Sequence, residues 1–446
     1  MASRTLDMTK GRPLPLLFRF ALPLMVGNVF QQLYTVVDTM VVGKALGVGA
    51  LAALGASDWL NWLMLGMIQG LTQGFAVLMA QAFGAREQDQ LHRTIGVSTV
   101  LCAVSAAVLV LAGQLFLKPV LGLMQTPDEI FGGASIYLRI MFGGIPIVMA
   151  YNLVSCILRS LGDSRTPLYA MILACGINIG LDLLFVLVFR WGIPGAAAAT
   201  LIAQCVSALF CLRQLARMGE ARVTKQDFRM HWPLAARLLR LGAAMAFQFL
   251  LISVGGLVVQ YVVNGVSVAF IAGFTASNKL YGIFEIAATS FGFAVVTFVG
   301  QNLGAGHRDR IRQGTWTAVG LAMITSVIVG AVMLLLGKWI LSGFISGTPE
   351  ETEAAMDTAY RYLSIMSLCL PVLYLIYIYR SALQGLENAS LPFASGVVEL
   401  VMRVGAALLL PRLVGESGIF YAEVLAWFGA DLVLVPGYFW MIRKWK

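Results

Sequence analysis

Two aspartates, an asparagine and a threonine lie inside long apolar stretches of this sequence, where together they could bind a small cation. The first stretch contains Asp38, a second contains Asn178 and Asp182, and a third contains Thr200. If each stretch is a helix that rises about 1.5 Å per residue, Asp38, Asp182 and Thr200 come to a similar depth below one boundary. Asn178 precedes Asp182 by four residues, which places both on one helix face. Carboxylate, amide and hydroxyl oxygens suit Na⁺, and neighbouring carboxylates removed from water also favour a bound proton. The spacing therefore predicts a site for Na⁺ or a proton.

A plainer interpretation is that these aspartates are hydrogen-bonded structural groups or reach the aqueous boundary. Ionisable side chains in hydrocarbon are costly, and they are functional candidates by default. Two acids at one depth, without a basic residue beside them, favour the binding site. Gln31 and Tyr34 precede Asp38 by seven and four residues, so the three share a helix face. We predict that Gln31 and Tyr34 line a substrate cavity.

The composition indicates that lipid is the solvent of this chain. Of its 446 residues, 59% are apolar and 12% are charged, whereas soluble domains average about 45–50% and about 25%. The six cysteines form no C-x-x-C pair, which argues against a metal centre or a disulfide framework. No Walker A loop is present, which argues against direct use of ATP. We expect no cofactor and no enzymatic activity.

Twelve apolar stretches are long enough to cross a bilayer core of about 30 Å, which takes about 20 helical residues. They run approximately over residues 15–42, 51–80, 94–117, 133–158, 167–189, 193–213, 238–263, 268–301, 314–341, 358–384, 391–411 and 418–441. None shows the in–out alternation of a β-barrel strand. The sequence predicts an all-α integral membrane protein with twelve transmembrane helices.

Lysine and arginine are distributed unevenly between the connectors. Most lie on the side of the amino terminus, including a basic stretch from Arg213 to Arg240, and Arg380 is assigned to a connector on that side. The positive-inside rule then places both termini in the cytoplasm. This asymmetry also explains the net charge of +9, so we expect no nucleic-acid partner. The polar amino terminus leads into a long apolar stretch, which predicts no cleaved signal peptide.

The two halves of the chain repeat each other. The segment Gln81-x-x-Gly84-Ala85 matches Gln301-x-x-Gly304-Ala305 at an offset of 220, and Pro146 and Pro167 match Pro371 and Pro392 at an offset of 225. Six helices separate matched positions, so both halves have the same orientation, as in transporters that rock two lobes around a central site. We predict two pseudo-twofold-related six-helix lobes around a central cavity. Residues 1–225 form the amino-terminal lobe, with a cytoplasmic linker around 213–237, and residues 226–446 form the carboxy-terminal lobe.

The second half does not repeat the cation cluster. Val258, Arg403 and Ala407 stand where the first half has Asp38, Asn178 and Asp182. The second half has its own charged residues at membrane depth, namely Lys279, Glu285, Glu399, Arg403, Glu423 and Asp431. Glu399 and Arg403 are four residues apart and predict an internal ion pair. We predict that Lys279 and Glu285 line the substrate cavity, while no role is predicted for Glu423 and Asp431. Pro146 and Pro371 predict static kinks.

These features resemble the multidrug and toxic compound extrusion (MATE) family of transporters. The resemblance rests on Gln31-x-x-Tyr34-x-x-x-Asp38-x-x-x-x-Gly43, on Ala52-Ala53-Leu54-Gly55 and on Gln81-Ala82-Phe83-Gly84-Ala85, and it covers essentially the whole chain. Within the family, the chain is similar to the DNA-damage-inducible-type branch, which has an aspartate on helix 1. That similarity implies a cation site at Asp38, Asn178, Asp182 and Thr200, and it adds Asn152 in the stretch 133–158.

The resemblance implies a secondary active antiporter that exports amphipathic or cationic organic compounds in exchange for Na⁺ or H⁺. It also implies a multi-pass protein of a bacterial inner membrane that is in contact with lipids, and we expect it to be a monomer. One alternative is a flippase for a lipid-linked precursor of the same superfamily, which would need basic residues in the cavity to hold pyrophosphate. A membrane-embedded enzyme is a second alternative, but the connectors show no grouping of His, Cys or paired Asp.

Overall fold

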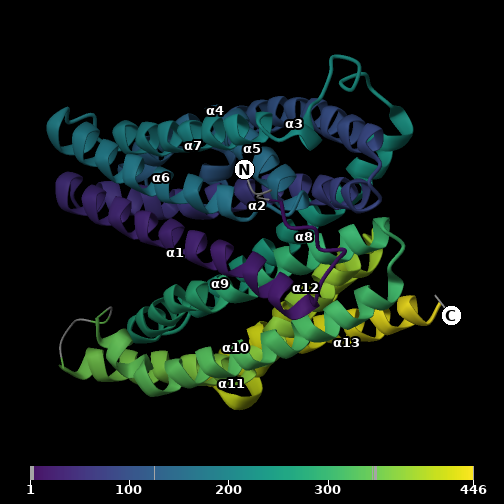
Figure 1. Ribbon diagram of the computed structural model, residues 1–446. Helices are drawn as coiled ribbons and strands as arrows, with labels where there is room; N and C mark the ends of the chain where they lie inside the picture. The colour runs from purple at the N-terminus through teal and green to yellow at the C-terminus, as the bar shows by residue number, and fades with distance from the viewer. Residues whose placement is uncertain (1–4, 125, 344, 346–348, 445–446) are drawn as a thin grey trace. The chain divides into compact units, whose positions relative to one another are not determined.

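The computed structural model describes residues 5–124, 126–343, 345 and 349–444, and these are almost entirely helical, with no strand among them (Figure 1). Within this described part of the chain, eleven helices are long and apolar enough to cross a membrane, and counting the bent pair α4 and α5 as one span gives twelve. The prediction of an all-α membrane protein is confirmed, and the count agrees with twelve spans. The elements of the first half are α1 (Pro13–Leu46), α2 (Val48–Gly84), α3 (Gln88–Leu123), α4 (Asp128–Gly143), α5 (Ile145–Ser160), α6 (Arg165–Asp182), the π-helix η1 (Leu183–Val188), α7 (Ile193–Ala216) and the short η2 (Gly219–Ala221).

The second half has the same succession of long helices. Its elements are α8 (Trp232–Asn264), α9 (Val268–Gly304), α10 (Arg308–Ser342), α11 (Pro349–Gly385), α12 (Ser390–Val414), the short η3 (Glu416–Phe420) and α13 (Tyr421–Arg443). The predicted kink at Pro146 is a break between α4 and α5, which bend by 48°. Pro371 lies inside the continuous helix α11.

The chain divides into two compact units. Unit 1 comprises Met1–Asp7 and Leu22–Ala246, and unit 2 comprises Met8–Ala21 and Phe247–Lys446. The units therefore change over at residues 246 and 247, later than the predicted boundary after residue 225. The segment Met8–Ala21 is held in unit 2 by side chains of that unit. The main-chain N–H of Met8 donates to Gln301 Oε1 at 2.9 Å, and Arg310 donates to the carbonyl oxygens of Met8 and Gly11.

Unit 1 is built on close approaches of helix backbones. A Cβ at Gly70 or Gly74 of α2 would lie 2.5 Å from the nitrogen of Ala246 or 2.4 Å from that of Gly242, both on α8. Small residues allow such contacts between membrane helices, and serine hydroxyls add hydrogen bonds across them. Ser207 of α7, for example, donates to the carbonyl oxygen of Ala170 in α6 at 2.9 Å. These contacts fix the helices that carry the candidate site.

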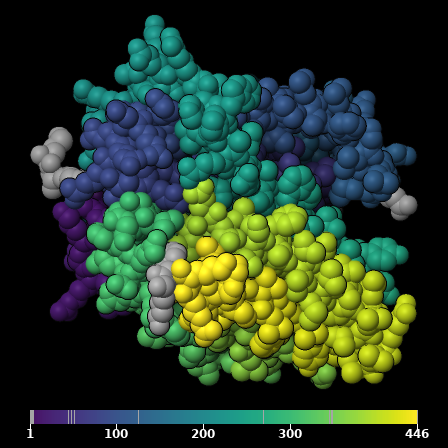
Figure 2. Space-filling model, turned by 90° about the vertical axis from the view of Figure 1, so that its right-hand side faces the viewer, coloured from purple at the N-terminus to yellow at the C-terminus, as the bar shows by residue number. Residues whose placement is uncertain are grey.

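The connector between α7 and α8 lies at the surface of unit 1, where Figure 2 shows it as the teal projection. Asp227 organises this connector by accepting hydrogen bonds from the main-chain N–H and the hydroxyl of Thr224, at 2.7 and 2.8 Å. The main-chain hydrogen bond, followed by that of the hydroxyl, lowers the pKa of Asp227.

In unit 2, a close backbone approach and hydrogen bonds from hydroxyl groups likewise join α9 to α11. A Cβ at Gly273 would lie 2.3 Å from the carbonyl oxygen of Ala355. Ser277 donates to the carbonyl oxygen of Ala359 at 2.7 Å, and the buried Tyr374 donates to that of Phe284 at 3.1 Å. Each hydroxyl thereby gains a hydrogen-bond partner away from water.

Candidate functional site

The candidate site of unit 1 is built around the end of α6. Asn178 and Asp182 are 1% and 0% exposed, inside a span that is otherwise apolar. Asp182 is the last residue of α6, and the chain continues as the π-helix η1. A π-helix widens the turn and is frequent at functional sites, because it redirects the backbone beside a side chain that must be placed accurately.

Helices α7 and α1 bring the remaining predicted ligands to α6. The amide nitrogen of Asn178 donates to Thr200 Oγ1 at 3.3 Å, which joins α6 to α7. Asp38 is half-buried on α1, and its carboxyl group lies near enough to that of Asp182 for the two to influence each other electrostatically. The structure therefore brings together Asp38, Asp182 and Thr200, which depth counting placed at one level, and Asn178, which the four-residue spacing placed on the face of Asp182. Two carboxylates held this close can share a bound cation or a proton.

Several oxygens of this group are buried without a donor. They are Asp38 Oδ1, Asn178 Oδ1 and both carboxylate oxygens of Asp182. Carboxylate oxygens removed from water are costly unless they are neutralised or bonded. Among the residues that the structure describes, no three His, Cys, Asp or Glu side chains form a metal-binding group. The donor set is thus two carboxylates, an amide and a hydroxyl, which fits a proton or a hard monovalent cation.

Three further predicted residues lie on α1 and α5. The side chain of Tyr34 interacts with Gln31 and with the charge of Asp38, so the structure brings together the face predicted for α1. Asn152 is placed differently. Its amide nitrogen donates to the carbonyl oxygen of Val148 in its own helix at 2.8 Å, and no hydrogen bond among those described connects it to the two aspartates.

Asp58 is an intramembrane acid that the sequence argument overlooked. It lies on α2, its side chain is exposed, and its charge acts on Asp38 and on Tyr137 of α4. The internal repeat could have pointed to it, because Ser57 matches Ser277 and the residues that follow them, Asp58 and Asn278, differ in charge. Unit 1 therefore has two further aspartates, Asp58 and Asp182, whose charges act on Asp38 within its membrane-spanning helices.

Unit 2 has a buried ionic network in place of this cluster. The predicted pair is confirmed, with Arg403 2.9 Å from Glu399. Glu399 also binds Arg380 at 2.8 Å, and Arg403 also binds Glu423 at 2.8 Å. The assignment of Arg380 to a connector was wrong. It lies inside α11 and is 9% exposed. Glu399 on α12 compensates its charge, and the hydropathy of α11 alone gives no sign of that partner.

The other predicted residues of unit 2 lie on α9 and α13. Glu285 is partly buried and accepts a hydrogen bond from the hydroxyl of Tyr377 at 3.0 Å. Lys279 is exposed on α9. Both carboxylate oxygens of Asp431 are buried without a hydrogen-bond partner. The placement of Lys279 and Glu285 along a substrate cavity stays a prediction.

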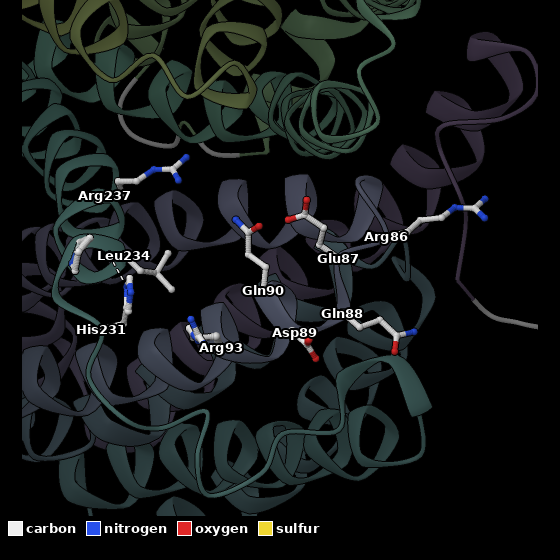
Figure 3. A pocket seen from close by; sticks show the side chains of 10 residues that line it. Arg86, Glu87, Gln88, Asp89, Gln90, Arg93, His231, Leu234 and Arg237 are labelled. Atoms are coloured by element: carbon white, nitrogen blue, oxygen red, sulfur yellow. Dashed lines mark hydrogen bonds between the residues drawn. The ribbon is translucent and has the colours of Figure 1, made fainter.

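A hollow of about 840 Å³ lies in unit 1 where α2 ends and where α3 and α8 begin. Figure 3 shows side chains of both charges around it, among them Arg93, Arg237 and Glu87. From Glu87 back to Asp58, α2 and its turn extend about 40 Å at 1.5 Å per residue. This hollow is therefore distinct from the aspartate site.

A family model named MatE matches residues 23–184 and 244–409. The chain belongs to the MATE transporter family. The model matches the chain in two segments, one in each half, as the internal repeat predicts, and the first segment contains Asp38, Asn178 and Asp182. The chain is thus a membrane transporter, and the family resemblance seen in the sequence is confirmed.

Relatives of this MATE protein are named as multidrug resistance proteins. The probable multidrug resistance protein YpnP of Bacillus subtilis is 32% identical over 76% of this chain and 76% of its own. A protein of Shewanella oneidensis named FAD transporter is 23% identical over 89% of this chain and 86% of its own. A solved outward-facing structure of a multidrug resistance MATE family transporter has a TM-score of 0.93 at 22% identity, over 100% of this chain and 99% of that one. Two of these three names refer to multidrug resistance, and the third refers to transport of FAD.

Proposed function

We propose that this MATE protein is a secondary active antiporter that exports amphipathic organic cations in exchange for Na⁺ or H⁺. The observation that carries the proposal is the set of buried oxygens without donors on Asp38, Asn178 and Asp182. Such a site gains most from a proton or a small cation, which is the property that a coupling site needs. The multidrug resistance names of the relatives support small organic compounds as the cargo.

Coupling follows from the way α1 is held against α6. A Cβ at Gly27 would lie 2.7 Å from the sulfur of Met171, so the two helices approach closely at this point. An ion that bridges Asp38 and Asp182 draws the outer part of α1 towards α6, and the arrangement of α1 without the ion binds the organic compound better. The ion shifts the equilibrium only to the extent that it binds one arrangement more tightly than the other.

The charges of unit 2 favour a cationic cargo over an anionic one. A lipid-linked pyrophosphate or an anionic nucleotide would need unsatisfied arginines. Arg380 and Arg403 are instead held by Glu399 and Glu423, with nitrogen–oxygen distances of 2.8–2.9 Å. No comparison supports the flippase alternative, and these ion pairs argue against it.

The finer assignments belong to the same proposal. We place the protein in the DNA-damage-inducible-type branch because an aspartate lies on α1 and the residues of the cluster fit that site. We propose that both termini lie on the cytoplasmic side of a bacterial inner membrane, which the basic connectors support. We expect one chain to be sufficient for transport, because each ligand of the proposed ion site comes from the same unit.

The proposal is tested with inverted membrane vesicles that contain the wild type, the double variant Asp38→Asn/Asp182→Asn, or Asp128→Asn. Asp128 is an exposed acid at the start of α4 and provides the matched control. We expect gradient-driven uptake of a fluorescent organic cation by the wild type and by the control, and none by the double variant. Undiminished gradient-driven uptake by the double variant would show that these aspartates do not couple transport.

A further inference from the structure

We propose that Asp58 of α2, together with Trp59 and Trp62, recognises the positive charge of the exported compound. This inference rests on the proposed function and identifies the residue that gives the transporter its preference for cations. It assigns two separate tasks to the acids of unit 1. Asp38 and Asp182 bind the coupling ion, and Asp58 binds the organic cation.

Asp58 lies inside the membrane span and is nevertheless exposed. The span runs over Ala52–Gly84, and Asp58 follows its first residue by six residues, which is about 9 Å along the helix. Ionisable side chains within membrane spans almost always face a protein interior or a water-filled cavity rather than lipid. The same helix face continues with Trp62 and Gln69, four and eleven residues later, so Asp58 shares its face with an aromatic ring and an amide.

The aromatic residues beside Asp58 suit an organic cation. Trp62 is 46% exposed, and its ring meets that of Trp59 edge-on, with centroids 6.0 Å apart and planes at 85°. An indole face attracts cations through its quadrupole, and tryptophan does so best among the aromatic side chains. A carboxylate with an exposed indole four residues away offers both a charge and a flat apolar surface to one ligand.

Unit 2 shows that packing alone does not require a carboxylate at this position. The counterpart of Asp58 at an offset of 220 is Asn278, whose amide oxygen accepts a hydrogen bond from Tyr362 at 3.4 Å. Tyr362 is in turn the counterpart, at an offset of 225, of Tyr137, on which the charge of Asp58 acts. Unit 2 therefore has a neutral amide at this position, bonded to the tyrosine that corresponds to Tyr137. The next residue there is Lys279 in place of Trp59, so the acid and the indole are both particular to unit 1.

The position of Asp58 also explains how cargo and ion exclude each other. The negative charge of Asp58 acts on Asp38, and it therefore favours a proton or Na⁺ at Asp38. An organic cation bound at Asp58 cancels that charge and weakens ion binding. By thermodynamic reciprocity, an ion bound at Asp38 weakens binding of the organic cation by the same factor. This mutual antagonism is the coupling that an antiporter requires.

The test is the binding of the fluorescent monocation ethidium to the full-length protein in nanodiscs, followed by anisotropy. Variants are Asp58→Asn, Asp58→Glu and the control Asp128→Asn. Because unit 2 has asparagine at the equivalent position, we expect Asp58→Asn to fold. Loss of one partly solvated charge contact is expected to raise the Kd about tenfold, while Asp58→Glu and the control keep it within about threefold.

A second readout separates recognition from structure. In the wild type, lowering the pH or adding Na⁺ should weaken ethidium binding, and in Asp58→Asn this antagonism should be lost. Ethidium binding by Asp58→Asn that equals the wild type in affinity and in antagonism would overturn the inference and leave the proposed function standing. A wild type that neither binds nor exports ethidium or any other organic cation would overturn both.

Discussion

Glu399 binds two arginines inside unit 2, so its replacement by glutamine should destabilise that unit strongly. The carboxylate is 4% exposed and lies 2.8 Å from Arg380 and 2.9 Å from Arg403. Glutamine keeps the shape but removes the charge, and removing one partner of a buried ion pair costs about 3–5 kcal/mol. Arg403 retains Glu423 at 2.8 Å, and Arg380 retains Ser395 at 3.3 Å. These remaining partners place the expected loss at the lower end, about 3 kcal/mol.

The loss can be measured by unfolding the purified protein in mixed micelles with increasing SDS. The matched control is Asp357→Asn, because Asp357 forms an ion pair of similar length, 2.9 Å with Arg361, between side chains that are 60% and 63% exposed. An exposed pair of this kind contributes at most about 1 kcal/mol. The reasoning would be refuted if Glu399→Gln lost no more stability than Asp357→Asn. The reasoning would be supported further if the double variant Glu399→Gln/Arg380→Gln lost less stability than the sum of the losses in the two single variants.

Two further predictions concern unit 1. Gly70→Ala should lower the free energy of unfolding by about 2–3 kcal/mol through overpacking, because its Cβ would lie 2.5 Å from the nitrogen of Ala246. Gly176→Ala is the control, because its Cβ would meet no atom within 4 Å. Equal unfolding midpoints of the two variants would contradict the close approach of α2 and α8. Protection of the Thr224 amide from hydrogen exchange should persist at neutral pH and fall as the pH drops through the lowered pKa of Asp227. The sign follows because the ionised carboxylate accepts this hydrogen bond, and protection that rises on acidification would refute it.

The sequence was sufficient for features that depend on one stretch of chain. Runs of apolar residues predicted the spans. Depth counting grouped Asp182 with Thr200, and the four-residue spacing added Asn178, which donates to Thr200 at 3.3 Å in the structure. The spacing of Glu399 and Arg403 predicted their ion pair, which is 2.9 Å long. In each case the rise of the helix or its periodicity relates sequence distance to spatial distance.

Features that depend on partners from other helices were beyond the sequence argument. Arg380 was assigned to a connector because its compensating acid, Glu399, lies on the next helix. Asp58 was overlooked because its relation to Asp38 joins α2 to α1. The π-helix after Asp182 has no marker in its residues, Leu183–Val188, which are as apolar as any span. The segment Met8–Ala21 groups with unit 2 because of side chains about 300 residues away, as in the hydrogen bond between Met8 and Gln301.

The central claim is that one ion gradient drives export through Asp38 and Asp182. The most direct measurement is transport of a fluorescent organic cation in proteoliposomes that contain only this protein, with Na⁺ and pH gradients imposed separately. We predict transport driven by one of the two gradients in the wild type, retained in Asp128→Asn and abolished in Asp38→Asn and in Asp182→Asn. The account would be contradicted if the rate of wild-type transport depended on neither gradient. It would also be contradicted if gradient-driven transport persisted in both aspartate variants.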